Sequence, residues 1–233
     1  MRSLRVFAAL VRWDFVRELR RKETVPSMVL FALLVLFLAH AGIGQDPALV
    51  SAAGPVVFWI AVLFAGTIGL AQSFAAEREG GALGAILVAP VGREVVYFAK
   101  IVSVGAYAFV MEAAAVGLYA VLFNANFGAR VAALLAVLAL FTIAYLAIGV
   151  VAAAMATALR GGGEVLLRIL LVPLMIPIIW LTLRVSETVF DARLAGGALG
   201  PPLDVGTYAA LAAALDAIYV TLGCVLFTKA LEA

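Results

Sequence analysis

Long apolar stretches recur along the chain, separated by short polar or glycine-rich segments. Six of them, at residues 25–43, 56–74, 101–123, 131–159, 165–183 and 208–227, are long enough to cross about 30 Å of hydrocarbon at about 1.5 Å per residue. They show no strand-like alternation and are dominated by Ala, Leu and Val, which favours helices over barrel strands. We therefore predict an all-α integral membrane protein with six transmembrane helices, forming a single domain over residues 1–233.

The composition supports this class. Hydrophobic residues make up 66% of the chain and charged residues 13%, whereas a soluble domain has about 45–50% and about 25%. The single cysteine, Cys224, and the single histidine, His40, leave no disulfide framework and no cysteine-rich metal site. His40 falls at the outer end of the first stretch, where we expect a headgroup-level side chain and no ligand role.

The basic residues predict the orientation. If the six stretches alternate in direction, every lysine and arginine except Arg130, Arg184 and Arg193 falls on the side of the N-terminus. Cytoplasmic segments carry the excess of Lys and Arg in membrane proteins. We therefore expect both termini in the cytoplasm, and residues 184–207 to form a periplasmic connection that leaves open a short re-entrant or lid helix.

Residues 1–23 are predicted to form an interfacial helix. Its apolar stripe holds Leu4, Phe7, Ala8, Val11, Phe15 and Leu19, and four arginines face away from that stripe, namely Arg2, Arg17, Arg20 and Arg21. Such a helix lies on the membrane surface with its arginines toward anionic headgroups. A simple basic anchor that only fixes the orientation is the alternative.

The longest cytoplasmic connection, residues 75–100, has the pattern of a docking segment. Its acidic start, short apolar run and proline end comprise Glu77, Arg78, Glu79, Gly80, Leu83, Ile86, Leu87 and Pro90. The run is too short to span, and exposed apolar residues with acidic flanks indicate a protein partner. A loop resting on the membrane is the alternative. A second helix begins near Gly92 and continues into the third span, which places Lys100 near the headgroups.

The fifth stretch combines a flexible start with two prolines. Arg160, Gly161, Gly162 and Gly163 form a tight predicted hairpin between the fourth and fifth spans. Pro173 and Pro177 lack an N–H, so two carbonyls lose their normal helical donors. In lipid each such carbonyl costs several kcal/mol unless protein or water satisfies it. The pattern predicts a span that pivots at its base and bends midway, with a static kink as the alternative.

Candidate chemistry within the membrane is limited to one carboxylate. Glu112 lies midway along the third span, where an ionised carboxylate costs about 2.5 kcal/mol or more, so it must be neutral, paired or facing water. The residues leave open whether Glu112 serves transport or packs against a polar neighbour. The sequence contains no GxxxxGK phosphate loop, no HExxH motif and no Gly-x-Ser-x-Gly motif. An intramembrane enzyme is therefore disfavoured.

Three motifs carry a family resemblance. The most specific is L-R-G-G-G-x-x-L-L-x-I-L-x-x-P-L-x-I-P over residues 159–177, and the others are Gly54-Pro55 before Trp59 and the acidic-glycine segment that precedes Pro90 and Lys100. Together they resemble heme exporter protein B, the permease family of the bacterial cytochrome c maturation system. Gly84 departs from the family, which often has Glu there, and glycine costs about 1 kcal/mol of helix propensity.

The resemblance implies the fold and partners of a type-2 ABC exporter permease in the bacterial inner membrane. Two copies would pair with two copies of a separate ATPase, which contacts the interfacial helix and the coupling helix after span two. The chain itself would have no catalytic residue, metal or bound cofactor, since ATP binds to the partner subunit and heme is handled by the wider complex.

Other cytochrome c maturation membrane subunits load heme onto a periplasmic chaperone, and ATP use is associated with release of the loaded chaperone. We expect the chain to be surrounded by lipid and to bind no nucleic acid. The alternatives are an exporter of a lipid, drug or polysaccharide, and a passive channel or membrane scaffold.

Overall fold

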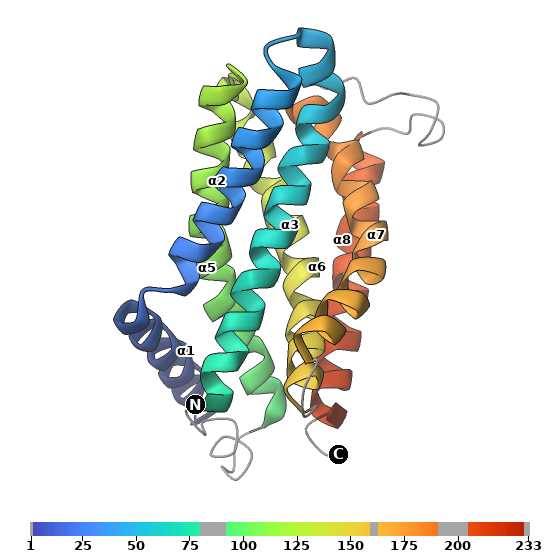
Figure 1. Ribbon diagram of the computed structural model, residues 1–233. Helices are drawn as coiled ribbons and strands as arrows, with labels where there is room; N and C mark the ends of the chain where they lie inside the picture. Colours follow the sequence, from blue (N-terminus) through green and yellow to red (C-terminus); the bar gives the residue numbers. More distant parts are fainter. Residues whose placement is uncertain (1, 80–91, 159–162, 191–204, 231–233) are drawn as a thin grey trace.

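The computed structural model describes residues 2–79, 92–158, 163–190 and 205–230. The elements are α1 (Arg2–Arg21), α2 (Thr24–Ile43), α3 (Pro47–Glu79), α5 (Arg93–Leu122), the 3₁₀ helix η1 (Gly128–Arg130), α6 (Val131–Ala158), α7 (Gly163–Val189) and α8 (Val205–Ala230). The helices α2, α3, α5, α6, α7 and α8 run side by side, and α1 lies obliquely at the foot of this bundle (Figure 1). The start of α1 and the end of α8 lie at the same end of the bundle.

The prediction of an all-helical membrane protein is confirmed. Within the described ranges, five helical segments are long and apolar enough to cross a membrane: Thr24–Ile43, Pro47–Ala75, Arg93–Leu122, Val131–Met155 and Gly206–Lys229. They coincide with five of the six predicted stretches. The remaining stretch, 165–183, lies within α7, a continuous helix of 27 residues.

The helix α6 forms the centre of the bundle. Its span is 61% buried, against 17% for the span of α2, and it packs against α3, α5, α7 and α8. Trp59 and Phe141, whose ring centroids are 4.9 Å apart, join α3 to α6. The core is therefore built around α6, while α2 presents most of its surface outward.

The helix α3 begins before the predicted apolar stretch 56–74. Pro55 lies inside α3, which begins at Pro47. A carboxylate oxygen of Asp46 accepts the N–H of Ala48 at 2.9 Å, as a helix N-cap does. Gly54 serves packing instead, because a Cβ there would collide with the hydroxyl of Tyr119 on α5. Because glycine has no side chain, Gly54 permits close contact between α3 and α5.

The outer connection is shorter than the predicted 184–207. The helix α7 continues to Val189, and α8 begins at Val205. Two contacts favour the extra turn of α7: Arg184 and Glu187 pair at 3.0 Å within the helix, and Trp59 donates to the hydroxyl of Ser186 at 2.9 Å. The predicted lid helix falls at residues 191–204, outside the described residues.

Candidate functional site

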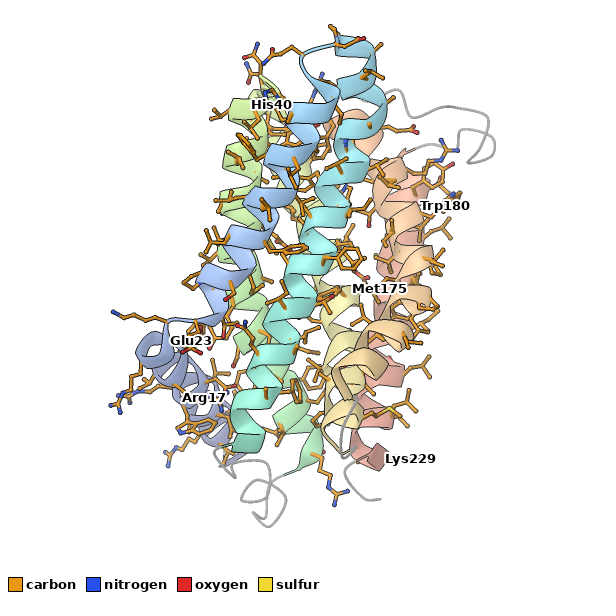
Figure 2. The ribbon with its side chains drawn as sticks, in the orientation of Figure 1. Arg17, Glu23, His40, Met175, Trp180 and Lys229 are labelled. Atoms are coloured by element: carbon orange, nitrogen blue, oxygen red, sulfur yellow. The ribbon has the colours of Figure 1, made fainter. Side chains whose placement is uncertain are left out.

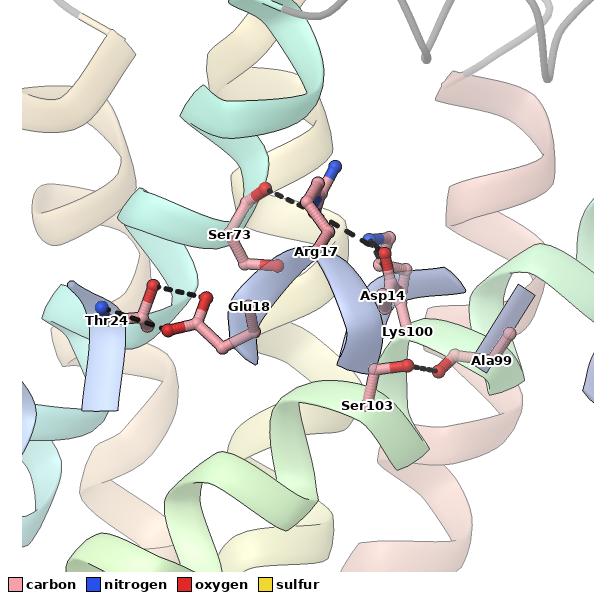
Figure 3. A network of polar contacts seen from close by, with 8 residues as sticks. All are labelled: Asp14, Arg17, Glu18, Thr24, Ser73, Ala99, Lys100 and Ser103. Carbon is pink, nitrogen blue, oxygen red and sulfur yellow. Dashed lines mark hydrogen bonds and ion pairs between the residues drawn. The ribbon is translucent and has the colours of Figure 1, made fainter. Parts of the chain in front are cut away.

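A buried ion pair joins the helix outside the bundle to a helix inside it. The ammonium group of Lys100 on α5 donates to both carboxylate oxygens of Asp14 on α1, at 3.0 and 2.9 Å (Figure 3). Both side chains are only 4% exposed. The Lys100 ammonium also lies 5.8 Å from the ring centre of Phe74 on α3. Lys100 therefore binds a carboxylate inside the protein, and its position at the level of the headgroups stays a prediction.

Arg17 extends this contact to the end of α3. Its guanidinium lies 3.4 Å from the Asp14 carboxylate and 3.5 Å from the carbonyl oxygen of Ser73, to which it donates. It also lies 4.6 Å above the Trp13 ring. Figure 2 shows Arg17 at the foot of the bundle. Because Arg17 is half-buried against protein, the prediction that it faces lipid headgroups is wrong.

Glu18 fastens the same helix to the beginning of α2. Its two carboxylate oxygens accept the backbone N–H of Thr24 at 3.0 Å and the Thr24 hydroxyl at 2.8 Å. A carboxylate at a helix N-terminus satisfies an orphan donor and opposes the positive end of the helix dipole. The turn between α1 and α2 is therefore fixed by side-chain contacts (Figure 3).

We define the α1 clamp as Asp14, Arg17, Glu18, Thr24, Ser73 and Lys100. It connects α1 to the last turns of α3 and to the first turns of α5, which are the two helices on either side of residues 80–91. Phe15 adds an edge-on ring contact to Tyr107 of α5, with centroids 5.5 Å apart. Short, mostly buried contacts therefore hold α1 against both helices.

Sequence reasoning missed Asp14, the centre of the clamp. The available signal was a carboxylate within a helix otherwise rich in arginine, together with a lysine about two turns inside the start of α5. Neither feature gives the pairing, because Asp14 and Lys100 are 86 positions apart. Only the packing of α1 across the foot of α5 brings them together.

The predicted coupling residues lie at the edge of the described chain. Glu77, Arg78 and Glu79 form the last positions of α3, so the acidic start is helical. Gly80, Leu83, Ile86, Leu87 and Pro90 fall outside the described residues. The predicted helix after this segment is confirmed, because α5 begins at Arg93 with Gly92 at its N-cap.

The foot of α5 is also bound to α6 and α8. The Tyr97 hydroxyl donates to the carbonyl of Ala147 on α6 at 2.9 Å. Arg93 donates to the carbonyl of Thr228 on α8 at 3.1 Å. Gly223 of α8 packs against this contact so closely that an added Cβ would lie 2.6 Å from the Ala147 oxygen. These contacts tie the base of α5 to three neighbours: α1, α6 and α8.

The proline-containing helix is continuous. Pro173 and Pro177 both lie inside α7 with exposed side chains, and α7 changes direction about half way along its length (Figure 1). The Tyr219 hydroxyl of α8 donates to the carbonyl of Leu174, between the two prolines, at 2.8 Å. This bond ties α8 to α7 near its prolines; the carbonyls that lose their helical donors are those of Ile169 and Pro173. Gly163 is the first residue of α7, while Arg160, Gly161 and Gly162 fall outside the described residues.

Glu112 has a polar neighbour in the core. It is 2% exposed, and the Thr142 hydroxyl of α6 donates to one of its carboxylate oxygens. This contact favours the packing alternative for Glu112. His40 lies edge-on to Phe123, with ring centroids 5.3 Å apart. Across the described ranges, no group of three or more His, Cys, Asp and Glu side chains could hold a metal ion.

These features define a multi-pass, all-helical membrane protein whose polar contacts gather where α1 meets the bundle. The sequence profile of the CcmB protein family matches residues 5–233, and the chain belongs to this family. It is 31% identical over 191 residues to heme exporter protein B of Bradyrhizobium diazoefficiens, covering 82% of this chain and 85% of the relative. It is 27% identical over 186 residues to heme exporter protein B of Haemophilus influenzae, covering 78% and 81%.

Proposed function

We propose that the chain is the membrane permease subunit of an ATP-driven transporter acting in cytochrome c maturation, and that a separate chain hydrolyses the ATP. Membership of the CcmB family and two relatives named heme exporter protein B support this function. The absence of a GxxxxGK motif from the sequence supports a separate ATPase. The permease would couple ATP hydrolysis to heme delivery or to release of a heme-loaded periplasmic chaperone.

The observation that carries the coupling role is the buried contact between Asp14 and Lys100. Breaking one partner of a buried ion pair costs about 3–5 kcal/mol, because the other charge is left without compensation. The helices α1 and α5 therefore move together at this point, and Arg17 brings in the end of α3. A force that an ATPase exerts on residues 77–90 would therefore displace α1, α3 and α5 together.

The proposed topology has six spans, with 165–183 of α7 as the fifth in order. An even number of crossings agrees with the position of the start of α1 and the end of α8 at one end of the bundle (Figure 1). The distribution of lysine and arginine supports a cytoplasmic location for that end, and membership of the CcmB family supports a bacterial inner membrane. The type-2 ABC exporter fold is part of this proposal, as is pairing with a second copy of the chain.

The proposed ATPase contact consists of Glu77, Arg78, Glu79, Gly80, Leu83, Ile86, Leu87 and Pro90. Two glutamates suit basic residues on a partner, and the apolar residues need cover in the cytoplasm. The glycines at 161–163 with Pro173 and Pro177 would let α7 respond to the ATPase cycle. The remaining proposed partners are the other cytochrome c maturation membrane subunits and the heme chaperone.

Purification with and without a candidate ATPase tests the function. The chain alone should show no ATP turnover, and it should gain turnover only when co-expressed with a P-loop partner. Leu83→Asp combined with Ile86→Asp should abolish co-purification of the ATPase while membrane insertion is retained. ATP turnover by the isolated chain would contradict the proposal. Unchanged co-purification of the double variant would place the contact elsewhere, with α1 as the next surface to test.

A further inference from the structure

Asp216 is a buried carboxyl group in the middle of a membrane-spanning helix. It belongs to the apolar segment Gly206–Lys229 of α8, about 15 Å from one end of that segment and about 20 Å from the other at 1.5 Å per residue. The residue is 6% exposed, and both carboxylate oxygens lack a hydrogen-bond partner among the described residues. Glu112, the other buried carboxyl group in a described span, accepts the Thr142 hydroxyl. Asp216 has no such donor.

Asp216 lies on the face of α8 that packs on α6. Gly223, two turns further along the same face, packs so closely on α6 that an added Cβ would lie 2.6 Å from the Ala147 oxygen. The α6 segment Val131–Ala158 contains no Lys, Arg, Asp or Glu. The helix opposite Asp216 therefore offers it no charged partner.

The other helices in contact with α8 are α5 and α7. Their described basic side chains are bound elsewhere, in the contacts Lys100–Asp14, Arg93–Thr228 and Arg184–Glu187. The other titratable side chains described on α5, α6 and α7 are Glu94, Tyr97, Tyr107, Glu112, Tyr119, Tyr145 and Glu187. None of them bonds to Asp216 within the described ranges. Tyr97 meets α8 at Gly223, about 11 Å along the helix from Asp216.

A proton is the ligand that suits this carboxyl group. An ionised carboxylate is costly in the middle of a span unless it is paired or reaches water. A calcium ion would need about 6–8 oxygen ligands, and the described residues contain no group of three or more His, Cys, Asp and Glu side chains that could hold a metal ion. A bound proton removes the charge and needs no further ligand.

We propose that Asp216 is a proton-binding site that keeps α8 packed on α6. The carboxyl group carries its proton in this arrangement and releases it when α8 separates from α6. On release the O–H bond breaks, the proton passes to an entering water molecule, and the negative charge stays on the carboxylate. Because water must then solvate that charge, the ionised form holds α8 apart from α6. The proposal requires only that α8 spans the membrane, so it stands independently of the proposed transport function.

The position and composition of α8 suit such a movement. Its span is 28% buried, against 61% for the span of α6. The segment around Asp216, AALAAALDA over residues 209–217, contains six alanines, so separation there exposes little apolar surface. Tyr219, one turn beyond Asp216, donates to the carbonyl of Leu174 between the two prolines of α7. A movement of α8 would therefore also act on the bend of α7.

Infrared spectroscopy of the full chain in lipid nanodiscs tests whether Asp216 carries a proton. At about pH 6 an aspartic acid in water, with its pKa of about 3.9, is almost fully ionised. The wild-type chain should nevertheless show the carbonyl band of a neutral carboxylic acid, and Asp216→Asn, which has the same size but cannot ionise, should lack that band. Glu112→Gln is the matched control, because it removes the other buried carboxyl group and should leave the Asp216 band in place. Superimposable carboxylic acid bands in the wild-type chain and Asp216→Asn would overturn the proposal.

Labelling of a single cysteine tests the movement of α8. Ala212 is 3% exposed and lies one turn before Asp216 on the same face. Ala212→Cys in a chain that also carries Cys224→Ser therefore reports whether water enters between α8 and α6. If opening is linked to loss of one proton, the open fraction rises about tenfold per pH unit.

The same cysteine in an Asp216→Asn chain is the control, because ionisation of the thiol is common to both chains. Labelling by a water-soluble maleimide should rise about tenfold more per pH unit with Asp216 than with Asp216→Asn. Ala209→Cys, two turns before Asp216 on the same face, replaces Ala212→Cys if that variant does not assemble. Equal pH dependence of labelling in the two chains would overturn the proposal.

Discussion

The ammonium nitrogen of Lys100 lies 3.0 and 2.9 Å from the two carboxylate oxygens of Asp14, in surroundings that leave each side chain 4% exposed. The two residues belong to α1, which lies obliquely at the foot of the bundle, and to α5, which runs the length of it. A surface ion pair is worth about 0–1 kcal/mol, but a buried one is costly to break. The pair therefore fixes where α1 sits against the bundle.

Replacing Lys100 with methionine should destabilise the protein markedly. Lys100→Met leaves the buried Asp14 carboxylate without its main partner, so we expect a loss of about 3–5 kcal/mol. Arg12→Met is the matched control, because Arg12 is an exposed cation on α1 and its loss should change stability by less than about 0.5 kcal/mol. The midpoint of thermal unfolding in detergent measures both. Equal midpoints for the two variants would contradict the importance of the buried pair.

A methyl group at Gly223 should disturb the contact of α5, α6 and α8. The Cβ of Gly223→Ala would meet the Tyr97 hydroxyl and would lie 2.6 Å from the Ala147 backbone oxygen. Overpacking of this kind costs about 1–3 kcal/mol. Gly117→Ala is the control, since no atom lies within 4 Å of its added Cβ and alanine is the better helix former by about 1 kcal/mol. Thermal unfolding should shift down for the first variant, and a shift of the same sign and size for the second would refute the packing argument.

The contact between Thr142 and Glu112 predicts a non-additive pair of substitutions. Thr142→Val removes the donor to a carboxyl group that is 2% exposed, which should cost about 1–3 kcal/mol. Combining it with Glu112→Leu removes both polar groups, so the double variant should be more stable than Thr142→Val alone. The comparison requires unfolding measurements on the single and double variants. Strictly additive losses would show that the two side chains do not interact energetically.

Straightening α7 should uncouple ATP hydrolysis from output. Pro173→Ala with Pro177→Ala restores two backbone donors and should leave binding of the ATPase intact, because residues 77–90 are unchanged. Stability should stay the same or rise, while cytochrome c maturation in cells should fall. The level of mature cytochrome c at matched permease level gives the result. Wild-type maturation with a demonstrably straightened helix would make the prolines packing features only.

The periodic features of the chain were predictable. Spans depend on local hydrophobicity, and α2, α5, α6 and α8 cover the predicted stretches closely. The predicted and observed helix bounds differ where contacts that the hydrophobic pattern does not show decide where a helix begins or ends. The helix α3 begins before the predicted stretch 56–74, because Asp46 caps it at Pro47 and Tyr119 occupies the space that Gly54 leaves. The helix α7 likewise extends beyond the predicted span because Ser186 bonds to Trp59.

The candidate site was only half predictable. The acidic residues at 77–79 and the start of α5 follow from the sequence pattern, because they flank an apolar run that is too short to span. Arginines of an interfacial helix are expected to face headgroups, so the pattern assigned Arg17 to headgroups, and it gave Lys100 no protein partner. Their actual partners, Asp14 and the Ser73 carbonyl, lie 86 and 56 positions away. Such pairings depend on how helices pack, which the pattern of one sequence does not encode.

The central claim is that Asp14 and Lys100 transmit motion by holding α1 to α5. A double-mutant cycle on cytochrome c maturation, at matched permease and ATPase levels, tests this claim most directly. Asp14→Leu and Lys100→Met should each reduce maturation strongly, because each leaves one buried charge unpaired. Replacing a whole buried ion pair by apolar residues is often neutral or stabilising, so the double variant should recover most of the wild-type activity. A double variant as inactive as the product of the two single effects would contradict the account.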